Sequence, residues 1–249
     1  MSFSPVHTPS KQLAVELGEI ITKAGIFAPR SKQIAIGPSE IGHDCTRRLA
    51  YKLLDWEKFN ESPGGNWSAQ VGTAIHGYLA DIFGKREGYE VERKVTIRGN
   101  LAGTVDLYDV NRGIVMDWKT TGSTGLKERR SSGPTNQQKI QVMLYCYGKK
   151  QAGYDVKQGA LVYLPTSGSI SDMHVELFDY DENLALAALE RLDSIHSLLG
   201  SMDLEKFPQY WDLVPAESNR LCNYCPYFVP FSKDLAKGCN GDTVSREPA

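Results

Sequence analysis

Hydrophobic and polar positions recur along the chain with two different periods, and together they predict a mixed α/β fold. Apolar residues at helical spacing predict helices at about 10–24, 39–54, 68–85, 136–150 and 182–199. Runs of alternating character predict strands at 89–98, 101–108, 114–120, 158–164 and 173–178. This order favours a central sheet with helices on both sides.

The segments between the periodic stretches complete this prediction. Short polar connections at 99–100 and 109–113 indicate that the first three strands form an antiparallel meander. Residues 60–66 read as a loop, and 122–134, rich in Gly, Ser, Lys and Arg, as a mobile basic loop. The first helix carries Leu13, Leu17 and Ile20 at helical spacing, so we expect it to pack on the core.

Composition indicates an ordinary globular protein. The 249 residues are 41% hydrophobic and 23% charged, which fits a single domain spanning 1–249. No apolar run is long enough to cross a bilayer, and the first residues lack the apolar segment of a signal peptide. We therefore expect a cytoplasmic protein without membrane contacts.

The net charge of −2 gives no global sign of nucleic-acid binding, so any contact with DNA must come from local basic clusters. A solvated charged face is the commoner meaning of each cluster taken alone. The candidates are Arg47, Arg48 and Lys52; Lys127, Arg129 and Arg130; and Lys149 and Lys150.

Two acidic positions and a lysine converge in the predicted meander. Alternation along the third strand puts Asp117 and Lys119 on one face. If Asp106 stands opposite Asp117, then Tyr108 faces Val115. Converging carboxylates repel unless they share a proton or a cation, and oxygen ligands favour Mg²⁺ or Mn²⁺. An Asp-x-Lys tripeptide alone is more often an exposed surface feature, so the context decides.

The context is a set of motifs that appear in order along the chain: GTAIHGYL with His76, GTVD with Gly103 and Asp106, DWK with Asp117 and Lys119, and QVMLY with Gln141 and Tyr145. With these motifs the chain resembles the RecB-like family of PD-(D/E)xK nucleases, in the branch of CRISPR-associated and phage exonucleases that carry an iron–sulfur cluster. The resemblance extends over residues 37–241. It implies a restriction-endonuclease-like core at about 67–200.

The resemblance also implies roles for these residues. His76, Asp106, Asp117 and the backbone carbonyl of Trp118 would ligate the metal, and Lys119 would position the attacking water. Gln141 and Tyr145, four residues apart on one helix face, would support the site and the scissile phosphate. Without the resemblance, a lone helical histidine is more often a packed core residue, and a polar helix stripe as often faces solvent.

The cysteines form a second constellation. Cys222 and Cys225 make a CxxC motif, Cys239 follows it, Cys45 lies far upstream, and Cys146 sits in an apolar helical stretch that favours a buried free thiol. A CxxC alone favours a local zinc site or unliganded thiols. The resemblance implies instead that Cys45, Cys222, Cys225 and Cys239 hold a 4Fe-4S cluster of structural role, in a lobe made of 37–56 and 215–241.

Three functions follow from these features. The first is a metal-dependent exonuclease acting on single-stranded DNA in recombination, repair or phage replication, with a recombination or annealing protein as a candidate partner. The second is a non-catalytic DNA-binding or assembly module that keeps the fold and the cluster. The third is a zinc-stabilised interaction protein. The complete His, Asp, Asp and Lys set favours the enzyme.

Overall fold

The computed structural model describes residues 9–26, 36–60, 67–217 and 220–241, and its centre is a five-stranded sheet in the order β1-β2-β3-β4-β5. The strands β1 (Tyr89–Arg98), β2 (Leu101–Asp109) and β3 (Ile114–Thr121) form the predicted antiparallel meander. β4 (Gln158–Pro165) pairs parallel with β3, and β5 (His174–Asp179) pairs antiparallel with β4. The parallel pair requires a crossover, which α6 (Asn136–Gln151) supplies.

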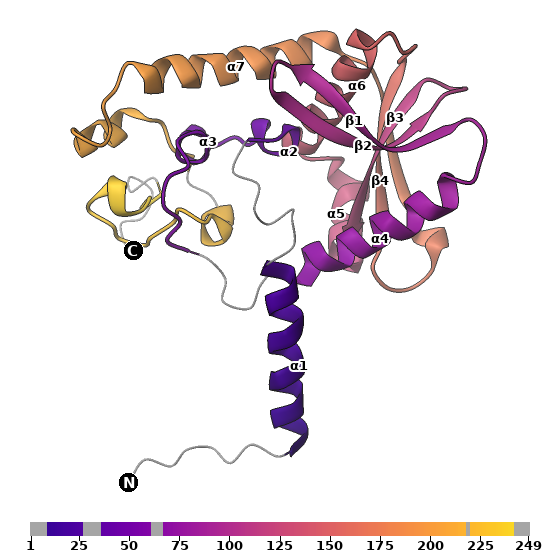
Figure 1. Ribbon diagram of the computed structural model, residues 1–249, viewed down its shortest axis with the longest axis horizontal. Coiled ribbons are helices and arrows are strands. Elements are labelled where there is room, and N and C mark those ends of the chain that lie inside the picture. The colour runs from indigo at the N-terminus through magenta and orange to yellow at the C-terminus, as the bar shows by residue number, and fades with distance from the viewer. Residues whose placement is uncertain (1–8, 27–35, 61–66, 218–219, 242–249) are drawn as a thin grey trace.

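Helices cover both faces of this sheet, as the order of predicted elements indicated (Figure 1). α6 lies over one face, with α7 (Glu182–Gly200) packed against α6, and α4 (Trp67–Phe83) lies over the other face. Alternation along β3 divides its side chains between the two layers, because Val115 belongs to the core cluster beneath α6 and Trp118 to the cluster beneath α4. The sheet is therefore buried on both sides at β3, where the acidic motif lies.

A third apolar cluster joins the two ends of the described chain. α3 (Thr46–Leu53) packs against segments that include the 3-10 turns η3 (Pro208–Leu213) and η5 (Leu235–Lys237). The Tyr51 ring stacks on Trp211, with 4.1 Å between ring centroids, and on Tyr227, at 5.0 Å. The Arg47 amide donates to the Pro215 carbonyl at 2.8 Å. Residues 37–56 thus pack against parts of 208–217 and 220–241, the latter including η4 (Arg220–Tyr224), and we call this region the lobe between the chain ends.

The predicted single helix over 39–54 is two helices, α2 (Pro38–Ile41) and α3. α2 ends at Ile41, and its C-cap residue Gly42 lies against α6. A Cβ at Gly42 would come 2.8 Å from Gln137 Cα, so a side chain there would collide with α6 backbone. Cys45 then takes an extended conformation as the N-cap residue of α3. The prediction of one helix missed this close packing, which depends on residues far away in the sequence.

The predicted mobile basic loop at 122–134 was wrong, because residues Ser123–Ser132 form helix α5. Gly122 and Gly133 bound this helix, and its Leu126 is buried in the core cluster beneath α6. Tertiary burial of a single apolar side chain outweighs the weak local preference of a Gly- and Ser-rich sequence. The predicted loop at 60–66 lies outside the described residues apart from Asn60.

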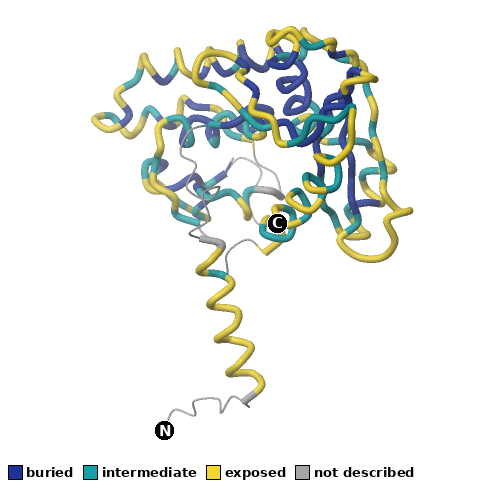
Figure 2. Tube along the Cα trace, turned by 45° about the vertical axis from the view of Figure 1, so that its right-hand side comes forward, coloured by how far each residue is buried: buried dark blue, intermediate teal, exposed yellow. Residues whose placement is uncertain are grey.

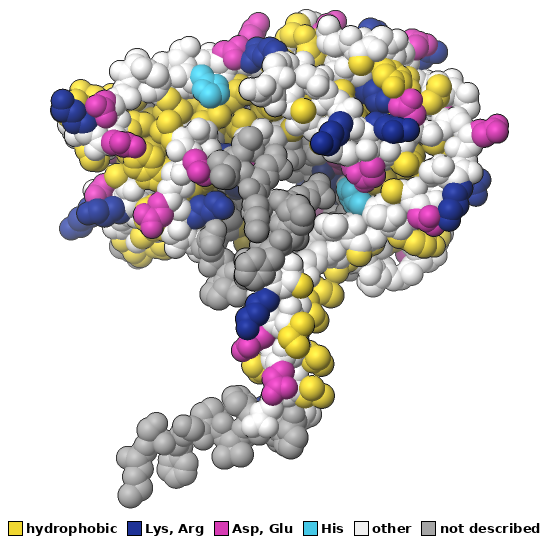
Figure 3. Space-filling view, in the orientation of Figure 1, with side chains coloured by type: hydrophobic (Ala, Val, Ile, Leu, Met, Phe, Trp, Pro, Cys, Tyr) yellow, Lys and Arg dark blue, Asp and Glu magenta, His cyan; other side chains and the backbone are white. Residues whose placement is uncertain are grey.

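The first helix, α1 (Pro9–Ile26), does not pack on the core as predicted. It projects from the body of the molecule and is exposed along most of its length (Figures 1 and 2). Leu13, Leu17 and Ile20 are 55%, 50% and 65% exposed, and apolar side chains gather along one side of the helix (Figure 3). The apolar period therefore identified a helix but not its neighbour. No helix in the described part of the chain is long and apolar enough to span a membrane.

Candidate active site

The candidate site lies where β2 and β3 stop pairing. The ladder joins Tyr108 to Val115, as the sequence predicts, and ends at Leu107 and Met116. One further step in the same register would bring Asp106 opposite Asp117. At that step the Asp106 carboxylate Oδ2 accepts a hydrogen bond from the Trp118 amide at 2.8 Å. The carboxylate is thereby fixed in the fork between the two strands.

His76 reaches this fork from α4, on the face of the sheet opposite α6. Its Nδ1 lies 3.4 Å from Asp106 Oδ1, and its Nε2 lies 3.2 Å from the Trp118 carbonyl oxygen. One imidazole therefore contacts two of the oxygen ligands that the sequence resemblance implies. The packing of α4 on the sheet, through Ile75 and Leu79, holds the ring in this position.

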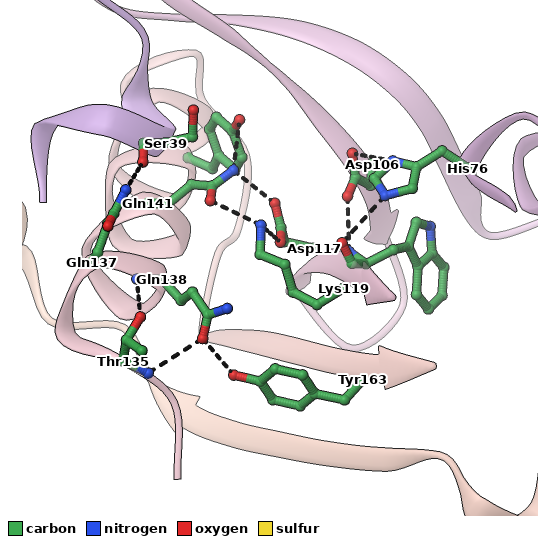
Figure 4. Close-up of polar contacts among 12 residues, drawn as sticks. Ser39, His76, Asp106, Asp117, Lys119, Thr135, Gln137, Gln138, Gln141 and Tyr163 are labelled. Atoms are coloured by element: carbon green, nitrogen blue, oxygen red, sulfur yellow. Dashed lines mark hydrogen bonds and ion pairs between the residues drawn. The ribbon is translucent and has the colours of Figure 1, made fainter. Parts of the chain in front are cut away.

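Asp117 and Lys119 point from β3 toward Gln141 on α6 (Figure 4), and Gln141 in turn contacts Tyr145 on the same helix. Lys119 Nζ lies 2.6 Å from Asp117 Oδ2 as an ion pair and donates to Gln141 Oε1 at 3.0 Å. Gln141 Nε2 is within hydrogen-bond distance of Asp117 Oδ1, at 2.9 Å, and of the Tyr145 hydroxyl, at 3.2 Å. Gln141 thus bridges the Asp117 carboxylate and the Lys119 ammonium. The polar stripe on α6 faces the site rather than solvent.

Burial sets the electrostatics of Asp117, whose side chain is 2% exposed. Burial raises the pKa of this carboxyl above its usual value, and the Lys119 ammonium acts in the opposite direction. The nearby Asp106 carboxylate raises the same pKa further. A divalent cation would offset this accumulation of negative charge more effectively than one lysine.

Glu92 is the site residue that sequence reasoning missed. It lies on β1, and its Oε1 is 3.9 Å from His76 Nδ1. One ligand atom from each of His76, Glu92 and Asp106 falls within 4.8 Å of the other two. The register of β1 with β2 places Val91 against Leu107 and Arg93 against Val105, so Glu92 stands opposite Asp106. The turn that pairs Arg98 with Leu101 would by itself put Arg93 opposite Asp106, and only the register shift between Thr96 and Arg98 brings Glu92 there, so no pattern in the sequence indicated it.

The donor set fits a divalent cation. Two carboxylates, an imidazole and a backbone carbonyl oxygen surround the fork, and carboxylate and carbonyl oxygens suit Mg²⁺ and Mn²⁺. The group is closed on the Asp106 side, where the side chain is 7% exposed, and open on the Glu92 side, where it is 41% exposed. The site is therefore half-buried and open to solvent on the Glu92 side.

Four of the five cysteines line one pocket in the lobe between the chain ends: Cys45, Cys222, Cys225 and Cys239. Cys146 is buried apart from them in the core, as predicted. Burial raises the pKa of Cys225 and of Cys239, so without a metal these groups are neutral thiols. Arg47, which lies 3.9 Å from Cys239 Sγ, supplies positive charge beside the pocket.

The arrangement of the four sulfurs can be compared with that of a tetrahedral zinc site. Tetrahedral zinc with Zn–S bonds of about 2.3 Å holds its sulfurs about 3.8 Å apart. All four cysteines belong to the described residues, and no three of their sulfurs lie within 4.8 Å of one another. The four sulfurs therefore do not form the compact tetrahedron of a zinc site in this structure.

The basic clusters divide into buried and exposed members. Arg47 is 8% exposed and donates to the Val214 carbonyl, and Lys149 is 2% exposed and pairs with Glu90. Neither is therefore a surface contact for DNA, which corrects that candidacy. Lys127 and Arg130 on α5 are exposed and remain candidates.

Comparison with known proteins assigns the family. Residues 44–228 match the family model of the PD-(D/E)XK nuclease superfamily, and because this match covers most of the chain, the chain belongs to that superfamily. Members of the superfamily use divalent metals, in agreement with the group of ligands around Asp106. No curated protein sequence matches the chain.

Solved structures with the same fold include exonucleases. The alkaline exonuclease LHK-Exo from Laribacter hongkongensis has 10% sequence identity and a TM-score of 0.50, with 78% of this chain and 98% of that chain covered. The structure of LHK-Exo in complex with dAMP has 11% sequence identity and a TM-score of 0.51, with 72% of this chain and 94% of that chain covered. A phage-related exonuclease from Haemophilus somnus 129PT has 16% identity and a TM-score of 0.45, with 64% and 82% covered. The two LHK-Exo structures, with TM-scores of 0.50 and 0.51, show a shared fold and, at these identities, nothing more.

Proposed function

We propose that this protein is a Mg²⁺- or Mn²⁺-dependent DNA exonuclease that hydrolyses phosphodiester bonds, with single-stranded DNA as its preferred substrate. The observation that carries the proposal is the convergence of His76, Asp106, Asp117 and Lys119 at one fork of the sheet. The similar fold of an alkaline exonuclease that binds dAMP supports mononucleotides as products. Such an activity would serve recombination, repair or phage DNA metabolism in the cytoplasm. A recombination or annealing protein is the partner that we propose.

Asp117 lies between two groups of residues with different proposed roles, one that binds the cation and one that contains Lys119. His76, Asp106, Asp117 and the Trp118 carbonyl oxygen would hold the cation, which would supply charge neutralisation at the phosphate and a lowered pKa of water. On the other side, the Lys119 ammonium orients the attacking water and offsets the charge that develops on the phosphate. Gln141 fixes Lys119 and Asp117 relative to each other through its two amide contacts, and Tyr145 holds Gln141.

Digestion of end-labelled DNA tests this proposal. Single- and double-stranded oligonucleotides labelled at either end are incubated with Mg²⁺, Mn²⁺ or a chelator. We expect metal-dependent release of mononucleotides, faster from single strands. Absence of any metal-dependent digestion by the wild-type protein would favour a non-catalytic DNA-binding or assembly module of the same fold.

We further propose that Cys45, Cys222, Cys225 and Cys239 bind a 4Fe-4S cluster with a structural role. The pocket that the four cysteines share supports it, because four thiolates are the ligands of such a cluster. Protein purified without oxygen should be brown, with broad absorbance near about 400 nm, and should contain iron and sulfide. Colourless protein with stoichiometric zinc would instead support a zinc-stabilised lobe.

A further inference from the structure

Glu92 has an unusual backbone conformation for a residue within a strand. Its φ angle is +48°, a left-handed value that side chains other than glycine rarely adopt. The ladder of β1 with β2 nevertheless keeps one register on both sides of Glu92. The backbone therefore turns locally at Glu92, but no residue is inserted into or removed from the pairing of β1 with β2.

The local turn reverses which face of the sheet the side chains occupy. Val91 packs with the cluster beneath α4, whereas Val95 belongs to the cluster beneath α6, although residues four apart on a regular strand share a face. β2 shows the same reversal, because Val105 and Leu107 also belong to different clusters. The reversal on the two strands is centred on one pair, Glu92 and Asp106.

The effect is to aim the Glu92 carboxylate at His76. Glu92 Oε1, His76 Nδ1 and Asp106 Oδ1 lie on the side of the fork away from Lys119, with 3.9 Å and 3.4 Å from the imidazole nitrogen to the two carboxylates. Asp117 is held from the opposite side by Lys119 and Gln141. The two sides of the fork thus have different chemistry: a cation-binding side and a lysine-containing side.

We propose that Glu92, which lies outside the sequence motifs, is an additional ligand of the catalytic cation. It completes a set of ligands with His76 and Asp106. This inference rests on the proposed function, because it concerns the same cation. Membership of a superfamily that uses divalent metals supports the presence of a cation at this fork independently of the geometry. The exposed side of Glu92 provides the route by which a hydrated cation enters.

The composition of this set also predicts which metal binds more tightly. Mg²⁺ prefers oxygen ligands alone and loses water reluctantly, whereas Mn²⁺ accepts an imidazole nitrogen more readily. A set that combines an imidazole nitrogen with carboxylate oxygens therefore binds Mn²⁺ more tightly than Mg²⁺.

Titration of the full-length protein with Mn²⁺, followed by calorimetry and by electron paramagnetic resonance of free Mn²⁺, tests this role. Glu92→Gln should weaken Mn²⁺ binding by about tenfold to a hundredfold, in the range that loss of a group supporting a metal site produces. Glu87→Gln is the matched control, because Glu87 is exposed in the turn between α4 and β1, and it should bind as the wild type does.

Glu92→Gly separates ligation from folding. Glycine adopts a φ of +48° without strain, so this variant should retain the wild-type melting temperature while losing Mn²⁺ affinity. Wild-type affinity in Glu92→Gln or Glu92→Gly would overturn the proposal.

Asp106→Asn distinguishes this inference from the proposed function. If Asp106→Asn loses Mn²⁺ binding and Glu92→Gln keeps it, the role of Glu92 is wrong and the proposed metal site stands. If the wild-type protein binds no Mn²⁺ and digests no DNA, both fail together.

Discussion

Lys119 and Asp117 contact each other at 2.6 Å, yet their proposed roles differ. Lys119→Ala should reduce DNA digestion by about 100-fold to 1000-fold, the usual cost of losing one positioned electrostatic group, and should spare Mn²⁺ binding. Asp117→Asn should reduce both digestion and Mn²⁺ affinity, because it removes a ligand oxygen. Single-turnover digestion and calorimetry measure the two effects.

Lys85→Ala provides the control for Lys119→Ala, because the Lys85 side chain is 71% exposed and lies outside the fork. It should digest DNA at the wild-type rate. Near-wild-type digestion by Lys119→Ala would remove the lysine from the mechanism.

Gly103 shows how one hydrogen atom in place of a side chain shapes the site. A Cβ there would lie 2.6 Å from Tyr145 Cε1 and 2.9 Å from Pro38 Cγ. Gly103→Ala should therefore displace Tyr145, lower the free energy of unfolding by about 1–3 kcal/mol and slow digestion. Urea denaturation measures the first effect, with Gly200→Ala as control because nothing lies within 4 Å of its added Cβ. Equal stability of the two variants would contradict this reading of Gly103.

At the level of single residues, the sequence predicts the site where regular geometry carries the information. Alternation and register were enough to bring Asp106 toward Asp117, and helical spacing put Gln141 and Tyr145 on one face. Glu92 escaped because the left-handed turn of its backbone breaks the alternation on which strand patterns depend. The roles assigned to these residues stay predictions until variants are measured.

Among the helices, α1 and α6 carry apolar residues in very different surroundings. Leu144 on α6 is fully buried, so Leu144→Ala should cost about 2–5 kcal/mol in the free energy of unfolding. Leu17 on α1 is 50% exposed, so Leu17→Ser should change stability by less than about 0.5 kcal/mol. Chemical denaturation of both variants checks this; a large loss for Leu17→Ser would mean that α1 packs against the core after all.

Most elements were predictable, because long periodic runs determine helix and strand over several turns or pairs. α5 and the break between α2 and α3 were not, since each depends on a distant contact: Leu126 in the core and Gly42 against α6. Local sequence carries little information about such contacts. For α1 the period was right and the predicted packing wrong.

At the scale of the whole molecule, the cysteine pocket links segments from the two ends. Cys45→Ala should lose iron and solubility, because it removes a proposed cluster ligand that ties α3 to the C-terminal segment. Cys146→Ala, which changes a fully buried thiol in the core, should retain its iron at a cost of about 1 kcal/mol. Iron analysis of both purified variants measures this; equal iron contents would exclude Cys45 as a ligand.

The sequence predicted the layered α/β architecture, because the order of helices and strands limits the ways to cover a sheet on both sides. Composition and spacing did not predict which distant segments meet. That Cys45 approaches Cys239 came from the family resemblance, since a cysteine far upstream has no local pattern that names its partners.

The lobe between the chain ends also affects how the protein is made. α3 leaves the ribosome early, but residues that cover Tyr51, such as Trp211 and Tyr227, are synthesised near the end. At about 5–20 residues per second, the apolar face of α3 waits on the order of ten seconds for its partners. Through that interval the nascent chain carries an uncovered aromatic surface, which makes it a substrate for chaperones that bind exposed apolar segments.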